Sequence, residues 1–343
     1  MKKLKVKQYN SWFKKIFIQI CRFIGYEIID QNNLFLPVTN KNAENRISQQ
    51  GIKSITLPLG IIKITRPVKS LDIILRTCAS VKLVNQSKER LFEKEKFVYS
   101  IKTLKSILNS INFSKDKLKN IEISITIIDD RSEPKILDEF KSILANHQIK
   151  SKILNLDVNK YKPQIKKIND ENKKVTEDML LNMSSIHQSF ELAENFKDLI
   201  YFVEDDYIHK KETILEMVLT YEKLSTQLNS ELFLCPSDYP FLYTNMEKNS
   251  ILLGDKSHWR EINQTLLTFL TSKKLLDKYL NEFKNMCTFE NRPFEKPLHK
   301  IYKKEYCFSP IPSLAMHCSN INSIYGIPPN LDWKKFWDEE GNF

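Results

Sequence analysis

The stretch Leu199-Ile-Tyr-Phe-Val-Glu-Asp-Asp-Tyr207 decides the fold, because five apolar or aromatic residues lead directly into three consecutive acids. The apolar run predicts a buried β-strand, with the acids at its carboxyl end. Carboxylate oxygens in such a place suit a divalent cation and the phosphates that a cation binds. Two interpretations stay open: Glu204, Asp205 and Asp206 form a metal-diphosphate site, or they are turn residues that cap a helix predicted near 211–224.

Apolar runs and helical patterns alternate along most of the chain. Strands are predicted at 71–75, 121–128, 153–156, 232–235 and 265–269, and helices at 97–111, 136–145, 183–196 and 273–276. This alternation is typical of an α/β fold with a mostly parallel central sheet flanked by helices. Ligands bind at the carboxyl ends of the strands in such sheets. Asp129 and Asp130 end the strand at 121–128, so they are predicted to open onto the same crevice as the acidic triplet.

The 343 residues divide into four predicted parts. These are a basic amphipathic helix in 1–30, a connector in 31–69 with a hairpin near 55–65, an α/β domain in 70–318, and a tail in 319–343. Within the domain, residues 157–178 are rich in Lys, Asn and Glu and predict an exposed, mobile excursion. It could be a lid over the crevice or a solvated insertion.

The N-terminal helix combines aromatic and basic residues. Trp12, Phe13, Ile16 and Phe17 recur at helical spacing, and lysines surround them. Such a helix can lie on an anionic membrane surface or pack on its own domain. No uninterrupted apolar run reaches the roughly 18 residues of a membrane span.

Composition narrows the choice of partners and compartment. The formal net charge is +11, but it comes from 45 Lys and only 8 Arg. Nucleic-acid surfaces favour Arg, so this balance indicates a solvated lysine-rich surface and no nucleic-acid partner. Six scattered cysteines without C-x-x-C spacing predict reduced thiols and a cytoplasmic protein, on the inner face of the membrane if the N-terminal helix binds lipid.

The order of these features resembles a known family. A first strand runs into Arg76-Thr77, followed by the turn Ile127-Ile-Asp-Asp-Arg-Ser132, the helix Asn182-Met-Ser-Ser-Ile-His-Gln-Ser-Phe-Glu-Leu-Ala193 and the acidic strand. This order is similar to that of the nucleotide-sugar glycosyltransferases of the GT-A fold, in particular family 2-like members, and Val203-Glu-Asp-Asp206 also resembles a form found in N-acetylglucosaminyltransferases. The resemblance covers roughly residues 70–318.

The resemblance implies a donor site and a metal site. The residues implied in nucleotide-sugar binding are Arg76, Thr77, Asp129, Asp130, Arg131, Glu204 and Asp205. The ligands implied for Mn²⁺ or Mg²⁺ are Asp206, chosen as the direct ligand, with Asp205 and His317; His317 could equally be structural. The chain departs from the family where a glycine is common in the turn, because Arg131 stands there.

The C-terminal half is implied to carry the acceptor and the general base. Glu290 or Glu295 would deprotonate the acceptor hydroxyl, with Glu290 slightly favoured and Asp238 next in line; either glutamate could instead begin a helix. Trp259 and Arg260 could contact a sugar and a phosphate, although a Trp is commonly a core residue.

The resemblance therefore implies a metal-dependent, inverting transferase that moves a sugar from a nucleotide-diphosphate donor, most simply a UDP-sugar, to a saccharide or glycolipid acceptor. Two alternatives stay open. One is a non-catalytic carbohydrate- or membrane-associated binding protein that keeps the fold. The other is a sugar nucleotidyltransferase, which is disfavoured because no glycine-rich phosphate loop follows the first strand.

Overall fold

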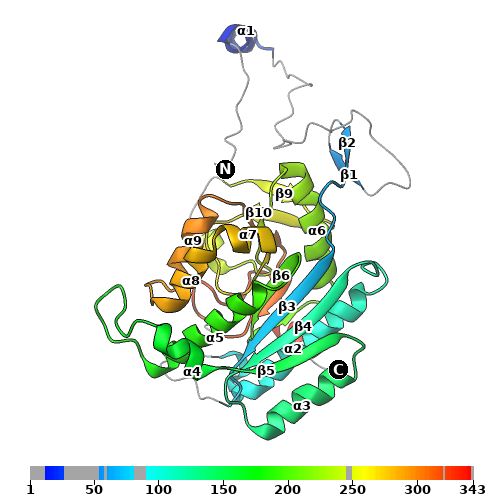
Figure 1. Ribbon diagram of the computed structural model, residues 1–343. Coiled ribbons are helices and arrows are strands. Elements are labelled where there is room, and N and C mark those ends of the chain that lie inside the picture. Colours follow the sequence, from blue (N-terminus) through cyan, green and yellow to red (C-terminus); the bar gives the residue numbers. More distant parts are fainter. Residues whose placement is uncertain are drawn as a thin grey trace.

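The computed structural model describes residues 12–26, 54–57, 60–80, 90–244, 249–319 and 321–340. In this part of the chain, a nine-stranded sheet runs through the molecule in the strand order β5-β4-β3-β6-β11-β8-β12-β10-β9. Helices lie on both faces of the sheet (Figure 1). The α/β class predicted from the sequence is confirmed.

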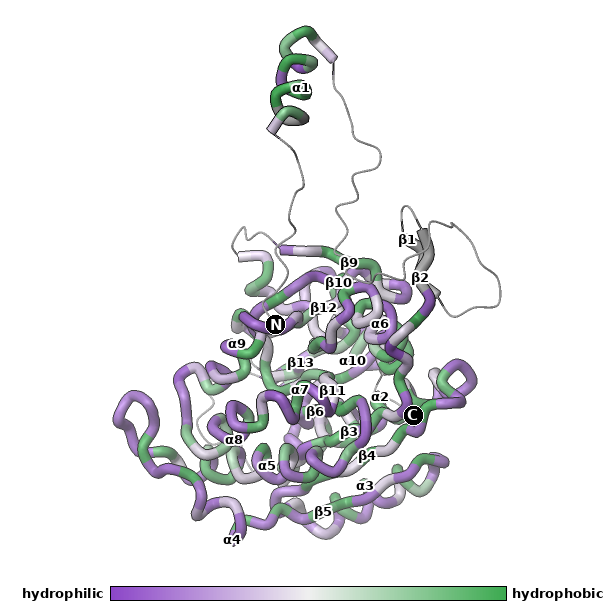
Figure 2. The backbone as a smooth tube through the Cα atoms, turned by 45° about the horizontal axis from the view of Figure 1, so that its top comes forward, coloured by the Kyte–Doolittle hydropathy of each residue, from purple (hydrophilic) through white to green (hydrophobic). Residues whose placement is uncertain are grey.

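The first described element is the helix α1 (Trp12–Phe23), which lies inside the predicted helical region. Its residues are mostly hydrophobic, as Figure 2 shows, and several large apolar side chains are exposed. None of the described helices is long and apolar enough to cross a membrane. The predicted hairpin is present as β1 (Ser54–Leu57) paired antiparallel with β2 (Gly60–Lys63). Residues 31–53 and 58–59 of the predicted connector lie outside the described residues, as do residues 1–11 and 27–30 of the predicted N-terminal part and residues 341–343.

Four parallel strands form one half of the large sheet. They are β3 (Ser70–Thr77), β4 (Glu122–Asp129), β5 (Lys150–Asn155) and β6 (Leu199–Glu204). β3, β4 and β6 lack the alternation of buried and exposed residues that marks a half-exposed strand. Helices cover both faces of the sheet and therefore bury both sides of these strands. β3 pairs with β4 on one side and β6 on the other, so the carboxyl ends of these three strands meet at one edge.

The other half of the sheet is mainly antiparallel, and of its strands the sequence predicted those near 232–235 and 265–269 and missed the rest. β11 (Phe269–Ser272) pairs antiparallel with β6 and with β8 (Phe233–Leu234), and β8 pairs parallel with β12 (Cys307–Ile311). β12 then pairs antiparallel with β10 (His258–Glu261), which pairs with β9 (Ile251–Leu253). The longest ladders are parallel, which confirms the prediction of a mostly parallel sheet. The antiparallel part consists of shorter strands.

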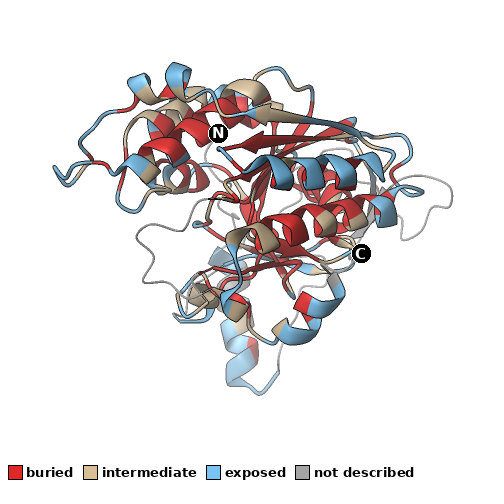
Figure 3. Cartoon of the chain, turned by 90° about the horizontal axis from the view of Figure 1, so that it is seen from below, coloured by how far each residue is buried: buried red, intermediate tan, exposed pale blue. Residues whose placement is uncertain are grey.

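Two groups of helices cover the sheet. α2 (Lys96–Ser114) packs against α3 (Pro134–Ala145) and α6 (Thr213–Leu228). α5 (Glu177–Ala193) packs against β3, β4 and α8 (Leu280–Thr288), and α8 packs against α7 (Lys273–Lys278) and α9 (Lys296–Tyr302). Figure 3 shows the buried strands between helices whose outer faces are exposed. The smaller elements are β7 (Tyr207–His209) paired with β13 (Ala315–His317), α4 (Val158–Tyr161), α10 (Trp333–Glu340), and 3₁₀ turns at Leu91–Glu93, Lys162–Gln164 and Pro240–Tyr243.

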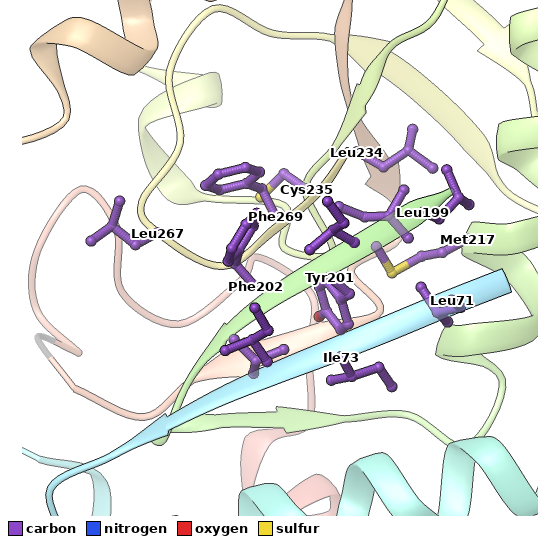
Figure 4. Packing of buried hydrophobic residues seen from close by; sticks show 14 of the residues in the cluster. Leu71, Ile73, Leu199, Tyr201, Phe202, Met217, Leu234, Cys235, Leu267 and Phe269 are labelled. Carbon is purple, nitrogen blue, oxygen red and sulfur yellow. The ribbon is translucent and has the colours of Figure 1, made fainter. Parts of the chain in front are cut away.

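The core joins the two halves of the sheet through aromatic side chains. Phe202 of β6 lies 5.0 Å from Phe190 of α5 and 5.2 Å from Phe269 of β11, measured between ring centroids. Figure 4 shows Tyr201 and Phe202 of β6 and Phe269 of β11, with Leu71 and Ile73 of the neighbouring β3 beside them. The packing holds the acidic end of β6 on a rigid support.

Three sequence expectations need correction. The helix predicted from 183 begins at Glu177, because the Thr176 hydroxyl accepts a hydrogen bond from the Met179 N–H and caps it. The strand predicted at 265–269 begins only at Phe269, since Thr268 Oγ1 accepts from the Glu204 N–H outside the ladder. The predicted excursion at 157–178 contains α4 and is bonded by its backbone to the segment at 288–290, through Lys166 N to Thr288 O at 2.9 Å and Asp170 N to Glu290 O at 3.2 Å.

Candidate functional site

The acidic triplet occupies the turn between β6 and β7. Glu204 is the last residue of β6, and Asp205 and Asp206 lead into Tyr207, the first residue of β7. Each acid faces a different cationic side chain. Those three cations come from β3, α2 and β13, so segments far apart in the sequence converge on this turn.

Asp206 and His317 form the part of the site most suited to a metal ion. His317 Nε2 lies 3.3 Å from Asp206 Oδ2, and the imidazole stacks on the Tyr207 ring at 4.7 Å between centroids. His317 Nδ1 lies 3.0 Å from the Tyr325 carbonyl oxygen. A carbonyl oxygen only accepts, so Nδ1 carries a proton, and in neutral imidazole the lone pair is then on Nε2, toward Asp206. Metal-binding histidines are commonly oriented by such an outer hydrogen bond.

The electrostatics of this pair favour opposite charges. Burial alone would raise the pKa of Asp206, but the charge and hydrogen bond of His317, together with a hydrogen bond from Ser319, bring it below its usual value. Burial alone would lower the pKa of His317, and the Asp206 carboxylate raises it above its usual value instead. Without a metal, a proton on Nε2 therefore balances the carboxylate.

Both carboxylate oxygens of Asp205 contact neighbouring residues of the protein. Its Oδ2 accepts from the Ser100 hydroxyl at 2.7 Å and from the Cys78 N–H at 3.0 Å, and its Oδ1 lies 3.4 Å from Lys96 Nζ. Burial would lower the pKa of Lys96, but Asp205 raises it above its usual value, so the lysine stays charged. Asp205 thus ties the end of β6 to α2 and β3.

Glu204 is paired with a cation that cannot lose its charge. Arg76 Nη2 donates to Glu204 Oε1 at 3.1 Å, and Nη1 donates to Asn182 Oδ1 at 2.9 Å. Burial raises the pKa of Glu204 more than Arg76 lowers it. Asn182 belongs to the first part of α5, so this arginine links the acidic turn to the helix of the resemblance.

The turn after β4 lies beside the same edge, as predicted. Asp129 is buried and accepts hydrogen bonds from Thr77 Oγ1 at 2.8 Å, Ser132 N at 2.9 Å and Ser132 Oγ at 2.5 Å. It therefore holds the turn together. Asp130 accepts from Arg131 Nε at 2.7 Å, and the Arg131 side chain is 54% exposed, so this guanidinium can reach a ligand.

Cys78 bridges the two acidic turns. Its N–H donates to Asp205, and its Sγ lies 3.4 Å from Asp130 Oδ2. Burial raises the pKa of this thiol to about 12, and the adjacent carboxylates act in the same direction, so it remains protonated. The two turns predicted to share a crevice are thus one hydrogen-bonded unit.

The two glutamates predicted as bases have different surroundings. Glu290 is buried; its Oε2 accepts from Asn169 Nδ2 at 3.2 Å and its Oε1 lies 3.0 Å from Arg292 Nη2. Glu295 is half-buried at the start of α9. Burial raises the pKa of Tyr325 to about 12, and the charge of Glu295 contributes to that rise. The carbonyl oxygen of the same Tyr325 bonds His317.

Three residues considered for the acceptor side belong to the core. Trp259 is fully buried, and its Nε1 donates to Glu216 Oε1 at 3.2 Å, so it presents no face to a sugar. Arg260 and Asp238 are buried together, with Nη2 2.5 Å from Oδ1. Burial raises the pKa of Asp238 in spite of this partner. Of the two interpretations of Trp259, the structure supports that of a core residue, because β10 is an inner strand and the side chain is fully buried.

Sequence reasoning missed several residues of the site. Lys96 begins α2, where a cation opposes the helix dipole. This unfavourable placement was the signal available in the sequence for a nearby acid, because an acid would offset the repulsion by the helix dipole. Ser100 lies one turn later on the same face. Cys78 and Tyr325 carried no recognisable signal, because one acts through its backbone N–H and the other through its carbonyl oxygen.

Among the described residues, no three His, Cys, Asp or Glu side chains converge closely enough to hold a metal ion by themselves. Asp206 and His317 offer one oxygen and one nitrogen. This set is incomplete alone and fits a cation that takes its remaining ligands from a diphosphate and water.

No protein-family model matches the sequence, and no curated protein sequence matches it significantly. Similar solved structures include S. aureus TarS, at 14% identity and a TM-score of 0.37, with 70% of this chain and 35% of that chain covered. Mouse xyloside xylosyltransferase 1 has 11% identity and a TM-score of 0.40, with 69% and 83% covered. The galactosyltransferase LgtC, solved with donor and acceptor sugar analogs, has 10% identity and a TM-score of 0.33, with 66% and 70% covered.

The chain thus spans about a third of the length of TarS. These likenesses concern the α/β architecture. At such identities and TM-scores they decide neither the activity nor any site residue, and membership of the predicted family stays a prediction.

Proposed function

We propose that this protein is a glycosyltransferase that takes a sugar from a nucleotide-diphosphate donor, most simply a UDP-sugar, and transfers it to a hydroxyl of a saccharide or glycolipid. The observation that carries the proposal is the Asp206–His317 pair at the carboxyl end of β6, with Nε2 directed at the carboxylate. The edge of an α/β sheet where parallel strands end is the usual place for a ligand.

Asp206 and His317 are the residues that would hold Mn²⁺ or Mg²⁺. Such a cation neutralises the charge that develops on a departing diphosphate. Asp205 is fully engaged by Lys96, Ser100 and the Cys78 N–H, so we assign it to positioning the turn rather than to the metal. This revises the predicted ligand set in favour of Asp206 and His317.

The nucleoside and the phosphates are assigned to the neighbouring turn. Asp130 faces the ligand edge with one exposed partner, Arg131, whose guanidinium can leave it for a phosphate oxygen. Asp129 and Thr77 are bonded to each other and support this turn from beneath. Arg76 balances Glu204, so the buried end of the site keeps no unpaired charge.

We assign the general base to Glu295. The Glu290 carboxylate is already bonded to Asn169 and Arg292, so neither of its oxygens is free to bond an acceptor hydroxyl. Glu295 is half-buried at the start of α9, and its charge acts on Tyr325, whose carbonyl oxygen bonds His317. In a single-displacement transfer, its carboxylate takes the proton of the acceptor hydroxyl as that oxygen bonds to the anomeric carbon and the nucleotide leaves, with inversion.

The test is nucleotide binding measured by thermal shift and calorimetry with UDP, GDP and CDP, each with and without Mn²⁺. We expect UDP to raise the melting temperature only with Mn²⁺, and Asp206→Asn to abolish that rise at an unchanged melting temperature of the free protein. Asp138→Asn, at an exposed ion pair on α3, is the matched control and should respond as wild type.

Each outcome has a distinct meaning. If Asp206→Asn still binds UDP and Mn²⁺ as wild type does, the acidic turn is structural and the proposal fails. Nucleotide binding without release of UDP from any UDP-sugar would favour the non-catalytic binding protein. Formation of a sugar nucleotide from UTP and a sugar phosphate would identify the nucleotidyltransferase instead.

We further propose that the protein works in the cytoplasm at an anionic membrane surface, which α1 contacts. Trp12, Phe13, Phe17 and Phe23 are 66%, 75%, 58% and 92% exposed, and apolar exposure of this extent on a basic helix suits the headgroup region of a bilayer. The six described cysteines are all free thiols, which supports a reducing compartment. A membrane location would bring the site close to a glycolipid acceptor.

A further inference from the structure

A second concave surface lies beside the segment that carries Glu290. It has a volume of about 600 Å³ and is lined by Lys166, Lys167, Ile168, Asn169, Asp170, Asn172 and Phe289. Small-molecule sites commonly have volumes of about 300–1,000 Å³. We call this surface the 166–172 hollow.

The backbone of the hollow is fixed. Asn169 Oδ1 accepts from the N–H groups of Glu171 at 3.0 Å and Lys173 at 2.9 Å, which closes the loop tip. Val175 N donates to Lys167 O at 2.9 Å. Ile165 and Val175 are buried against α5. The loop therefore presents its side chains from a set position, as a binding site requires.

The charge around the hollow is unbalanced. Its neighbouring acids already have cationic partners, because Asp170 pairs with Lys296 at 3.0 Å, Glu171 with Lys173 at 2.8 Å, and Glu290 with Arg292. Lys166 and Lys167 make no ion pair in the described part of the chain, and Lys166 Nζ lies over the Phe289 ring at 4.9 Å. Two exposed ammonium groups that no described acid pairs with favour an anionic ligand.

One acceptor atom in the hollow lacks a partner. Lys296 Nζ donates to Asp170 Oδ2, and the backbone N–H of Arg292 also acts on this carboxylate, but Oδ1 is buried and has no hydrogen bond of normal geometry among the described residues. Buried carboxylate oxygens are normally satisfied, so an unsatisfied one calls for an explanation. A ligand hydroxyl donating to Oδ1 would supply the missing bond, and sugars are rich in hydroxyl groups.

The hollow is connected to the donor site by two routes. Leu180 and Met183 of α5 pack against the loop. Asn182, which lies between them in the sequence, accepts a hydrogen bond from Arg76, the partner of Glu204. Along the chain, Phe289, which lines the hollow, and Glu295, the residue assigned as the base, belong to one short segment. A ligand lying along this segment would reach both.

We propose that the 166–172 hollow binds the acceptor and selects a saccharide that carries an anionic group, a phosphate or a carboxylate. Lys166 and Lys167 meet the anionic group, Asp170 Oδ1 and Asn172 bond hydroxyls, and Phe289 packs against the apolar face of a sugar ring. Calling the ligand an acceptor rests on the proposed glycosyl transfer, whereas the binding of an anionic saccharide does not depend on that proposal.

The experiment is a binding screen of the full chain against an array of neutral, phosphorylated and carboxylated saccharides. We expect retention of anionic members, and at least a tenfold loss of their binding in Lys166→Ala/Lys167→Ala. Lys150→Ala/Lys152→Ala removes the same charge from two exposed residues of β5 and should bind as wild type. Asp170→Asn should weaken binding and confirm that the carboxylate takes part.

Three results would overturn the inference: no binding of anionic saccharides by wild type, equal losses in the two double-lysine variants, or equal binding of neutral analogues. The thermal shift with UDP and Mn²⁺ is measured on the same samples. If Lys166→Ala/Lys167→Ala keeps that shift and loses saccharide binding, both proposals stand. Saccharide binding by wild type without any UDP shift would reject the glycosyltransferase proposal and leave the hollow as a carbohydrate site.

Discussion

Each acid of the β6 turn faces a cationic side chain, and these side chains differ in whether they can lose a proton. Arg76 stays charged beside Glu204, and the pKa of Lys96 beside Asp205 is raised, so neither can make room for a metal by losing a proton. His317 beside Asp206 can, because a neutral imidazole is also a metal ligand. The three pairs thus divide the triplet into two structural acids and one acid available to a ligand.

The assignment of the base leads to a prediction about turnover. Glu295→Gln should lower the release of UDP from the preferred UDP-sugar by about 10²–10⁴-fold, the usual contribution of a general base, with an unchanged thermal shift by UDP and Mn²⁺. Glu290→Gln is the matched variant and should cost much less in turnover, since Asn169 and Arg292 hold that carboxylate in place. The reverse ranking would return the base to Glu290.

Arg131 leads to a prediction about backbone strain. Its φ is +56°, in the left-handed region, at the place where the resembling family commonly has glycine. Arg131→Gly and Arg131→Ala both lose the contact with Asp130, so the difference in stability between the two variants reports the backbone conformation alone. We expect the Gly variant to be more stable by about 1 kcal/mol in urea unfolding.

Lys141, in the helix α3, provides the control with the opposite sign. There Lys141→Ala should be more stable than Lys141→Gly by about 1 kcal/mol, because glycine costs conformational entropy in a helix. If Gly is also the less stable residue at position 131, the left-handed backbone is not strained.

Individual residues were predictable from the sequence where they end an apolar run. Asp129, Asp130 and the β6 acids were located in this way, and they meet because parallel strands end at one edge. Lys96 was not predicted, since its partner lies more than a hundred positions away. Trp259 shows the converse case, because the chemistry of a Trp is the same in a core and in a crevice.

Strands and helices differ in how far their neighbours could be foreseen. The long ladders of β3, β4 and β6 follow from runs of buried, largely β-branched residues with helices between them. β13 has three residues, too few for a pattern, and yet it carries His317 to the site, whereas the two-residue β8 lies inside the strand predicted at 232–235. The His317 side of the site therefore depends on an element with a weak sequence signal.

The helix α1 leads to a prediction about membrane binding. Deleting residues 1–30 should release the protein from anionic vesicles in co-sedimentation, while the UDP and Mn²⁺ shift stays unchanged. Each lysine near an anionic surface adds about 1 kcal/mol of attraction, and the exposed aromatic face adds apolar burial. Trp12→Ala/Phe13→Ala should weaken the binding with the charge intact. Equal sedimentation of the truncated and full chains would show that α1 is not the membrane contact.

The two halves of the molecule are joined by a partly buried charged cluster that the sequence did not predict. Arg66, just before β3, donates to Asp198 before β6 at 2.5 Å and to Glu231 before β8 at 2.9 Å. Tyr221 of α6 donates to Glu231 at 2.7 Å. The cluster ties the amino end of the parallel strands to the antiparallel half, opposite the functional edge.

This cluster should make the stability of the whole molecule depend on pH. Burial by itself would raise the pKa of Glu231, but hydrogen bonds from Arg66 and Tyr221 lower it from 4.5 to about 2. A group whose pKa is depressed in the folded state stabilises the protein above its unfolded pKa and loses that effect as the pH falls through the folded pKa. The contribution, about 3 kcal/mol at neutral pH, should decline from pH 4.5 toward pH 2.

Urea unfolding of Glu231→Gln and wild type at pH 7, 4.5 and 3 tests this. The difference in free energy of unfolding should be about 3 kcal/mol at pH 7 and about half of that at pH 3, because the unfolded glutamate is protonated there while the folded one is not. Glu339→Gln, which removes an exposed ion pair on α10, should change the free energy by less than about 1 kcal/mol at every pH. A difference for Glu231→Gln that does not vary with pH would show that Arg66 does not hold this carboxylate ionised, and the link between the two halves would then depend on apolar packing alone.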